Sequence, residues 1–156
     1  MLSTEVQVLS ELLIANGLTI SVAESCTGGS LSHAITSIPG ASSYFDCGYI
    51  TYSNQSKIDM LGIDIQAIKI YGAVSEEVAL EMVIGLATKS HSDVAVSITG
   101  VAGPTGGTPE KPVGTVCFGF SCEAKTSTST QVFSGDRVSI VSQSVSYALR
   151  QISLRF

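Results

Sequence analysis

Residues 23–29 read AESCTGG, and this stretch decides how the chain is interpreted. An apolar run over residues 18–23 leads into two adjacent nucleophile candidates, Ser25 and Cys26, and a helix-like segment follows the glycine pair. This order predicts a strand, a tight turn and a helix N-terminus. The first N–H groups of a helix have no intrahelical partner and lie at the positive end of its dipole, so they can hold a phosphate or an oxyanion. The stretch therefore predicts a nucleophile poised for acyl transfer.

The rest of the chain alternates helical and strand-like patterns. Helical spacing of apolar residues, with Ser, Asn or Asp before and Gly or Pro after, predicts helices before and after each of the first strands. Short runs rich in β-branched and aromatic residues predict the strands. The expected strands are residues 18–23, 48–52, 94–98, 114–121 and 126–133; the expected helices include 28–36, 54–61, 65–71, one that begins at Ser75, and a last one opened by residues 134–137.

Strands separated by helices imply crossovers and parallel pairing, whereas the last two strands read as an antiparallel hairpin. We therefore predict a three-layer α/β/α sandwich with a mixed, mostly parallel sheet. The length of 156 residues predicts one domain over residues 1–156. Ligands in such folds bind beyond the carboxyl ends of strands, which here carry Ser25, Tyr52 and the loop after Thr99.

A lysine can activate Ser25 in the absence of a histidine triad. Lys57 lies in the helix that follows Tyr52, at a second strand-to-helix junction, and a buried lysine that loses its charge becomes a usable base. Tyr52 could relay the proton or fix the geometry. The plainer interpretations are that Ser25 caps a helix, Tyr52 packs on a strand and Lys57 is solvated.

Cys26 is the rival nucleophile, because a thiol at a helix N-terminus has a lowered pKa. A Cys26 amidase would keep its activity in a Ser25→Ala variant and lose it on thiol alkylation. The remaining cysteines, Cys47, Cys117 and Cys122, form no zinc-like spacing, and we expect no metal site.

A glycine-rich segment, residues 99–107, follows the third strand and would let a ligand approach the backbone closely. It lacks the Gly-Lys-Ser/Thr ending of a Walker motif, which argues against nucleoside-triphosphate hydrolysis. Arg137 lies near a helix start, an unfavourable place for a cation unless an anion offsets it, and could clamp a phosphate.

The composition and charge of the chain indicate which classes of partner it can bind. The formal charge is −5 and the eight Lys and Arg residues are scattered, which argues against a nucleic-acid partner. No apolar run approaches the roughly 18 to 20 residues of a membrane span, and residues 1–5 lack the features of a signal peptide. We expect a soluble cytoplasmic protein with no membrane partner. An apolar chain of this size could form a homodimer.

Six blocks of sequence follow one another along the chain: Ala23–Gly29, Thr51–Asn54 with Lys57, Gly72–Ser75, Thr99–Pro104 with Gly106 and Gly107, Lys111–Thr115, and Gly135–Arg137. In this order, the blocks resemble the C-terminal domain of the CinA (competence/damage-inducible) family. The resemblance covers nearly the whole chain and predicts the stand-alone form, without the larger N-terminal domain.

The resemblance implies a nicotinamide mononucleotide (NMN) deamidase, which converts NMN and water to nicotinate mononucleotide and ammonia. It implies Ser25 as nucleophile with Lys57 and Tyr52 as the base, and neither a metal nor an organic cofactor. Oxyanion and phosphate contacts are expected from backbone and side chains of the neighbouring motifs. These expected contacts are Cys26, Thr27, Gly28, Thr99, Gly100, Gly103, Gly106 and Arg137.

Two departures from the family pattern stand out. Cys47 replaces a frequent glycine, and Val141 with Ser142 follow Arg137 where relatives often add basic residues. The first could change packing and the second could weaken phosphate affinity. A competing hypothesis is a module that binds or senses a nucleotide without turning it over; retention of Ser25, Tyr52 and Lys57 favours the enzyme.

Overall fold

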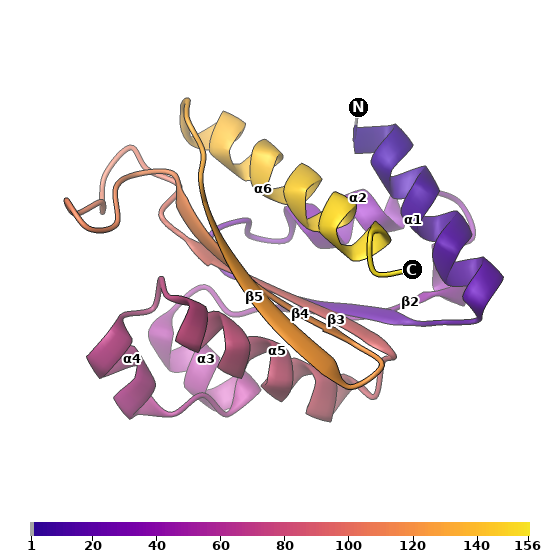
Figure 1. Ribbon diagram of the computed structural model, residues 1–156, viewed down its shortest axis with the longest axis horizontal. Helices are drawn as coiled ribbons and strands as arrows, with labels where there is room; N and C mark the ends of the chain where they lie inside the picture. The colour runs from indigo at the N-terminus through magenta and orange to yellow at the C-terminus, as the bar shows by residue number, and fades with distance from the viewer. Residues whose placement is uncertain (1) are drawn as a thin grey trace.

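A computed structural model describes residues 2–156 and shows a sheet covered by helices on both faces (Figure 1). The sheet has five strands in the order β2-β1-β3-β4-β5. β1 pairs in parallel with both β2 and β3, and β4 is antiparallel to both β3 and β5. The strands are β1 (Ile20–Glu24), β2 (Phe45–Ile50), β3 (Val94–Gly100), β4 (Thr115–Cys122) and β5 (Lys125–Val132).

The helices divide into two layers, α1, α2 and α6 on one face and α3, α4 and α5 on the other (Figure 1). The predicted three-layer α/β/α sandwich with a mixed sheet is confirmed. The helices are α1 (Leu2–Asn16), α2 (Ser30–Thr36), α3 (Asn54–Leu61), α4 (Ile65–Tyr71), α5 (Glu76–Ser90) and α6 (Arg137–Ser153), with a 3₁₀ turn η1 (Ala41–Ser43).

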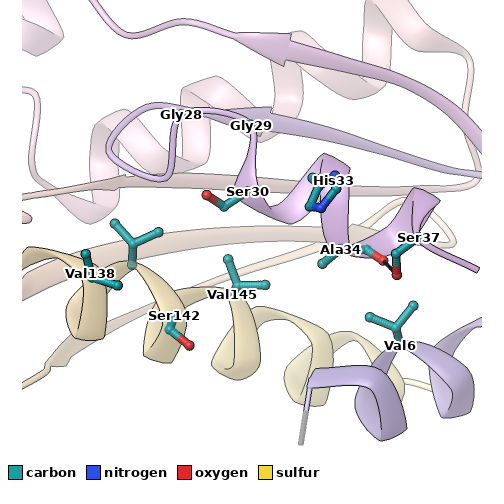
Figure 2. A pocket seen from close by; sticks show the side chains of 11 residues that line it. Val6, Gly28, Gly29, Ser30, His33, Ala34, Ser37, Val138, Ser142 and Val145 are labelled. Carbon is teal, nitrogen blue, oxygen red and sulfur yellow. Dashed lines mark hydrogen bonds between the residues drawn. The ribbon is translucent and has the colours of Figure 1, made fainter.

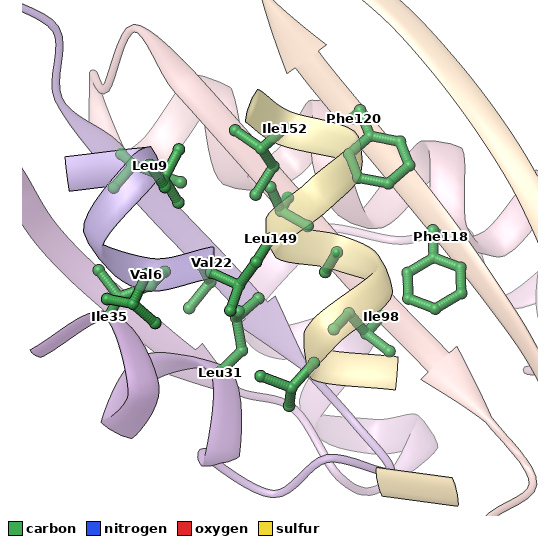
Figure 3. Packing of buried hydrophobic residues seen from close by; sticks show 14 of the residues in the cluster. Val6, Leu9, Val22, Leu31, Ile35, Ile98, Phe118, Phe120, Leu149 and Ile152 are labelled. Atoms are coloured by element: carbon green, nitrogen blue, oxygen red, sulfur yellow. The ribbon is translucent and has the colours of Figure 1, made fainter. Parts of the chain in front are cut away.

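The larger part of the core lies between the sheet and the α1, α2 and α6 layer. Side chains from all three helices meet the inner faces of β1, β3 and β4, and Figure 3 shows this packing. Because the central strands β1 and β3 are buried on both faces, their polar side chains are buried as well. The residues labelled in the figure are Val6, Leu9, Val22, Leu31, Ile35, Ile98, Phe118, Phe120, Leu149 and Ile152.

Two sequence predictions are corrected by the structure. The second strand was expected over residues 48–52 but spans Phe45–Ile50, so Tyr52 lies in the loop beyond it. Its side chains alternate between half-buried and exposed, since β2 is an edge strand covered on one side. The 3.6-residue spacing of apolar residues predicts Val138 on the buried face of the last helix, but its side chain in α6 is 77% exposed, whereas Ser144 is fully buried.

Candidate active site

The carboxyl ends of β1, β2 and β3 lie side by side and bring the predicted functional residues together. Glu24, the last residue of β1, is in register with Ile50 of β2 and Ile98 of β3. Ser25 therefore follows one strand while the loop with Tyr52 follows its neighbour. The backbone of Ser25 is fixed by a hydrogen bond of 2.9 Å that its N–H donates to the carbonyl of Ile98.

Ser25 and Lys57 are in direct contact. Lys57 Nζ lies 3.0 Å from Ser25 Oγ, and the same nitrogen donates to the carbonyl oxygens of Thr51 at 2.9 Å and Tyr52 at 3.3 Å. The Ser53 side chain caps α3 by accepting a hydrogen bond from Ser56 N, which orients the first turn that carries Lys57. Only 1% of Lys57 and 8% of Ser25 are exposed to solvent.

Burial lowers the pKa of Lys57, because the ammonium form loses its hydration and gains no carboxylate partner among the residues described. Interaction with Cys26 opposes this shift and raises the pKa. A lowered pKa increases the fraction of the lysine that is present as the neutral amine at a given pH. The neutral amine has a lone pair that can accept the proton of the Ser25 hydroxyl.

Cys26 is next to this pair but is poorly suited to act as a nucleophile. Burial raises the pKa of its thiol to about 12, and the negative charge of Glu24 adds to the rise. The thiol is therefore protonated at neutral pH, whereas the thiolate is the reactive form. The structure favours Ser25 over Cys26.

The Tyr52 hydroxyl is held at the edge of the site by Arg137. The side chain of Tyr52 is 56% exposed, and its hydroxyl accepts a hydrogen bond of 2.7 Å from Arg137 Nη2. Arg137 Nη1 donates to the carbonyl of Gly103 at 2.8 Å. Lys57 is contacted by the backbone carbonyl of Tyr52, not by its phenol. The role of the hydroxyl as a proton relay stays a prediction.

A cavity of about 280 Å³ opens above Ser25 and Lys57. All residues predicted from the sequence line it except Thr27 and Gly28. Six further lining residues were not among the predicted site residues, although they belong to or adjoin the motifs that resemble the CinA family: Asn54, Ala73, Val74, Val101, Ala102 and Thr105. The lining residues are Ser25, Cys26, Tyr52, Asn54, Lys57, Ala73, Val74, Thr99–Gly103, Thr105, Gly106 and Arg137.

The N-terminus of α2 does not face this cavity with free N–H groups, contrary to the expectation from the sequence. The side chain of Glu24, fully buried, accepts hydrogen bonds from the N–H groups of Gly29, Leu31 and Ser32. The Gly28 N–H donates to the carbonyl of Ser25. The positive end of the α2 dipole is thus occupied by a carboxylate of the protein itself, which sequence reasoning missed.

A second, larger cavity of about 630 Å³ lies between α2, α6 and α1 (Figure 2). Its walls are mostly apolar, with Val138, Val141 and Val145 on one side and Ala34 on the other. Gly28 and Gly29 border it, so the turn after Ser25 separates the two cavities. No pairing of a nucleophile with a base comparable to Ser25 and Lys57 occurs among the residues that line it.

Within residues 2–156, no three His, Cys, Asp or Glu side chains come together as a group that could bind a metal ion. None of the helices described there combines the length and the apolar character needed to cross a membrane.

The sequence was compared with family models. The model of the CinA C-terminal domain matches residues 3–155. This chain belongs to the CinA C-terminal domain family. Solved structures of the CinA superfamily share the fold: a protein from Escherichia coli superposes with a TM-score of 0.95 at 35% identity, covering 99% of this chain and 90% of its own. A competence or damage-inducible protein from Enterobacter asburiae gives a TM-score of 0.96 at 32% identity, and the match covers 99% of this chain and 98% of that protein's chain.

Curated relatives of this CinA C-terminal domain include stand-alone proteins of similar length. A protein named nicotinamide-nucleotide amidohydrolase PncC, from Enterobacter agglomerans, is 48% identical over 92% of this chain and 87% of its own. The protein of the same name from Escherichia coli K12 is 44% identical over 100% of this chain and 98% of its own length. A CinA-like protein from Chloroherpeton thalassium, 48% identical over 83% of this chain, is matched over 32% of its own length.

Proposed function

We propose that this protein hydrolyses the carboxamide of nicotinamide mononucleotide, giving nicotinate mononucleotide and ammonia. The observation that carries the proposal is the 3.0 Å contact between Ser25 Oγ and the buried Lys57 Nζ. Stand-alone relatives at 44% and 48% identity, named as nicotinamide-nucleotide amidohydrolases, support the substrate. The activity would recycle pyridine nucleotides in the cytoplasm.

In the first half of the reaction, Ser25 Oγ attacks the carboxamide carbon while neutral Lys57 takes the hydroxyl proton. A tetrahedral intermediate forms, with negative charge on the former carbonyl oxygen. When the C–N bond breaks, the Lys57 ammonium returns the proton to the leaving nitrogen. The products of this half are ammonia and a nicotinoyl ester on Ser25, and Lys57 is neutral again.

In the second half, water attacks the ester carbon. Lys57 takes a proton from the water and then returns it to Ser25 Oγ as the ester C–O bond breaks. Nicotinate mononucleotide leaves and the free enzyme is restored. These steps use protein groups and water alone, so the proposal includes no metal or organic cofactor.

The charge that develops on the carbonyl oxygen needs hydrogen-bond donors near Ser25. In the part of the chain described here, the N–H groups of Cys26 and Thr27 donate to no other residue, whereas the N–H of Gly28 is already engaged. We assign the oxyanion contacts to Cys26 and Thr27. For the ribose phosphate we assign Arg137 and the loop from Thr99 to Gly106, which line the same cavity.

The test is ammonia release from NMN by the purified protein, beside folded Ser25→Ala and Lys57→Ala variants. We expect release by the wild type and a loss in both variants of at least about 1000-fold, since the nucleophile and its base act as one unit. A wild type that releases no ammonia, yet melts at a higher temperature with NMN, would instead support the nucleotide-binding module.

The phosphate assignment has a separate test. Arg137→Met should raise KM for NMN while leaving KM for nicotinamide riboside, which has no phosphate, almost unchanged, because only NMN can pair with the guanidinium. The matched control is Arg150→Met, which removes an arginine at the far end of the same helix that pairs with Glu5. Equal losses on both substrates would contradict the assignment.

A further inference from the structure

Glu24 directly precedes Ser25, and its side chain is fully buried. Oε2 accepts hydrogen bonds from Gly29 N at 3.2 Å and Leu31 N at 3.0 Å. Oε1 accepts two more from Ser32, one from its N–H and one from its hydroxyl, both at 2.8 Å. Four donors thus converge on the two carboxylate oxygens.

These bonds close the turn that contains the nucleophile. Glu24 is the last residue of β1, and the Glu24 side chain reaches the residues where α2 begins. Residues 25–28 therefore lie inside a loop whose two ends are joined by one side chain. The helix has no capping side chain of its own at Gly29, which adopts a left-handed backbone. Glu24 takes the place of that cap.

Backbone hydrogen bonds hold the turn where it leaves β1. The Glu24 carbonyl accepts a hydrogen bond from Thr51 N, which ties β1 to the loop beside Lys57. Ser25 N is bonded to the carbonyl of Ile98. The strand side of the turn is fixed by these backbone bonds alone. On the helix side, the Glu24 side chain adds its hydrogen bonds to two backbone bonds, from Gly28 N to the carbonyl of Ser25 and from Ser30 N to the carbonyl of Thr27.

The chemistry of the four partners requires a carboxylate at this position. Three of them are backbone N–H groups, which can only donate, and a carboxylate offers only acceptors. An amide would turn an NH₂ group toward at least one N–H donor. No ion pair compensates the carboxylate within the described residues, so its burial depends on these hydrogen bonds and on the dipole of α2.

We propose that Glu24 is a positioning residue for Ser25: it holds the turn so that Ser25 Oγ stays within hydrogen-bond distance of Lys57. The inference rests on the proposed function of Ser25 as the nucleophile. Since Glu24 acts through the turn and has no contact with the cavity, its loss should slow the attack by Ser25 and leave substrate binding nearly unchanged.

The experiment compares Glu24→Gln with the wild type in two assays run well below the melting temperature. The first measures kcat and KM for ammonia release from NMN. The second measures the rate at which a small fluorophosphonate labels Ser25, read by mass spectrometry, which needs the nucleophile and its base but no NMN. The matched control is Glu76→Gln, which alters a carboxylate that also accepts two hydrogen bonds, from Thr128 and Thr130, away from the site.

We expect folded Glu24→Gln to lose on the order of 10- to 100-fold in kcat and in labelling rate, with KM changed by less than about 3-fold. Glu76→Gln should keep both rates. A folded Glu24→Gln that labels at the wild-type rate, or that changes only KM, overturns the proposal.

Two milder variants decide the matter if Glu24→Gln does not fold. Ser32→Ala removes the hydroxyl donor, and Gly48→Ala introduces a methyl group that would collide with that hydroxyl from β2. Slower labelling in either folded variant supports the proposal, and wild-type labelling in both overturns it. Labelling of Ser25 without ammonia release removes NMN as the substrate and leaves the Glu24 comparison valid, whereas absence of labelling in the wild type overturns both.

Discussion

Lys57 is buried, and its amine is within hydrogen-bond distance of three oxygen atoms, from the Ser25 hydroxyl and two backbone carbonyls. Such an environment solvates an ammonium less well than water does, so the neutral amine is favoured. A base with a lowered pKa can accept the serine proton at a pH where an exposed lysine would remain charged. The reactivity of the site thus depends on where α3 places one side chain.

We expect kcat/KM for NMN to rise with pH as Lys57 loses its proton. Because burial lowers the pKa of Lys57, the midpoint of this rise should lie below about 10.4, the ordinary lysine value. The measurement is a pH profile of kcat/KM. Lys57→Arg should be inactive throughout, since arginine stays protonated. A rise centred at or above the ordinary value would contradict the role of a perturbed lysine.

Cys26 allows an independent check on the identity of the nucleophile. Since its pKa is raised to about 12, we expect Cys26→Ala to keep activity within about 5-fold of the wild type, the residual effect being a packing change. Iodoacetamide at neutral pH should inactivate the wild type no faster than it inactivates Cys26→Ala. Activity lost in Cys26→Ala but kept in Ser25→Ala would make the cysteine the nucleophile.

At the scale of elements, the sequence predicted those whose ends carry strong local signals. The predicted bounds of α3 and α4 are confirmed, because Ser53 and Gly62 flank the first and Gly72 ends the second. β2 was misplaced since its alternation of half-buried and exposed residues depends on the sheet edge, which is a tertiary feature. The positioning role of Glu24 was missed for the same reason, because its four hydrogen-bond donors come together only when the turn folds.

The turn of the β4–β5 hairpin has a strained backbone. Its two-residue turn, Glu123 and Ala124, adopts φ values of 50° and 61°, which L-residues other than Asn and Asp rarely adopt. We expect Ala124→Gly to stabilise the protein by about 0.5 to 1 kcal/mol, measured by denaturant unfolding, since the steric cost exceeds the added chain entropy.

The matched control for this turn is Ala87→Gly within α5, where the same change should destabilise by about 1 kcal/mol. If Ala124→Gly shifts the unfolding midpoint in the same direction as Ala87→Gly, the turn is not strained.

At the scale of the whole molecule, the buried lysine makes stability depend on pH. Between the lowered pKa of folded Lys57 and the ordinary value of the unfolded chain, the unfolded state binds more protons, so the free energy of unfolding rises with pH. Below this window the ammonium must be buried, and the penalty is present in full.

Lys57→Met removes that titration and keeps an unbranched side chain that is one heavy atom shorter. We therefore expect the melting temperature of the wild type, relative to Lys57→Met, to increase as pH is raised from 7 towards about 10. Both proteins are scanned by calorimetry in matched buffers. A difference that is independent of pH would mean that Lys57 titrates alike in the folded and unfolded chains.

The direction of β4 has a practical consequence. β3 ends at the site and β4 runs antiparallel to it, with Gly100 opposite Val116 and Val94 opposite Cys122. The hairpin at residues 123–124 is therefore at the end of the sheet remote from the cavity. A linker grafted there would fix the protein to a solid support with the cavity facing the solution, so an immobilised form should accept substrate as freely as the dissolved one.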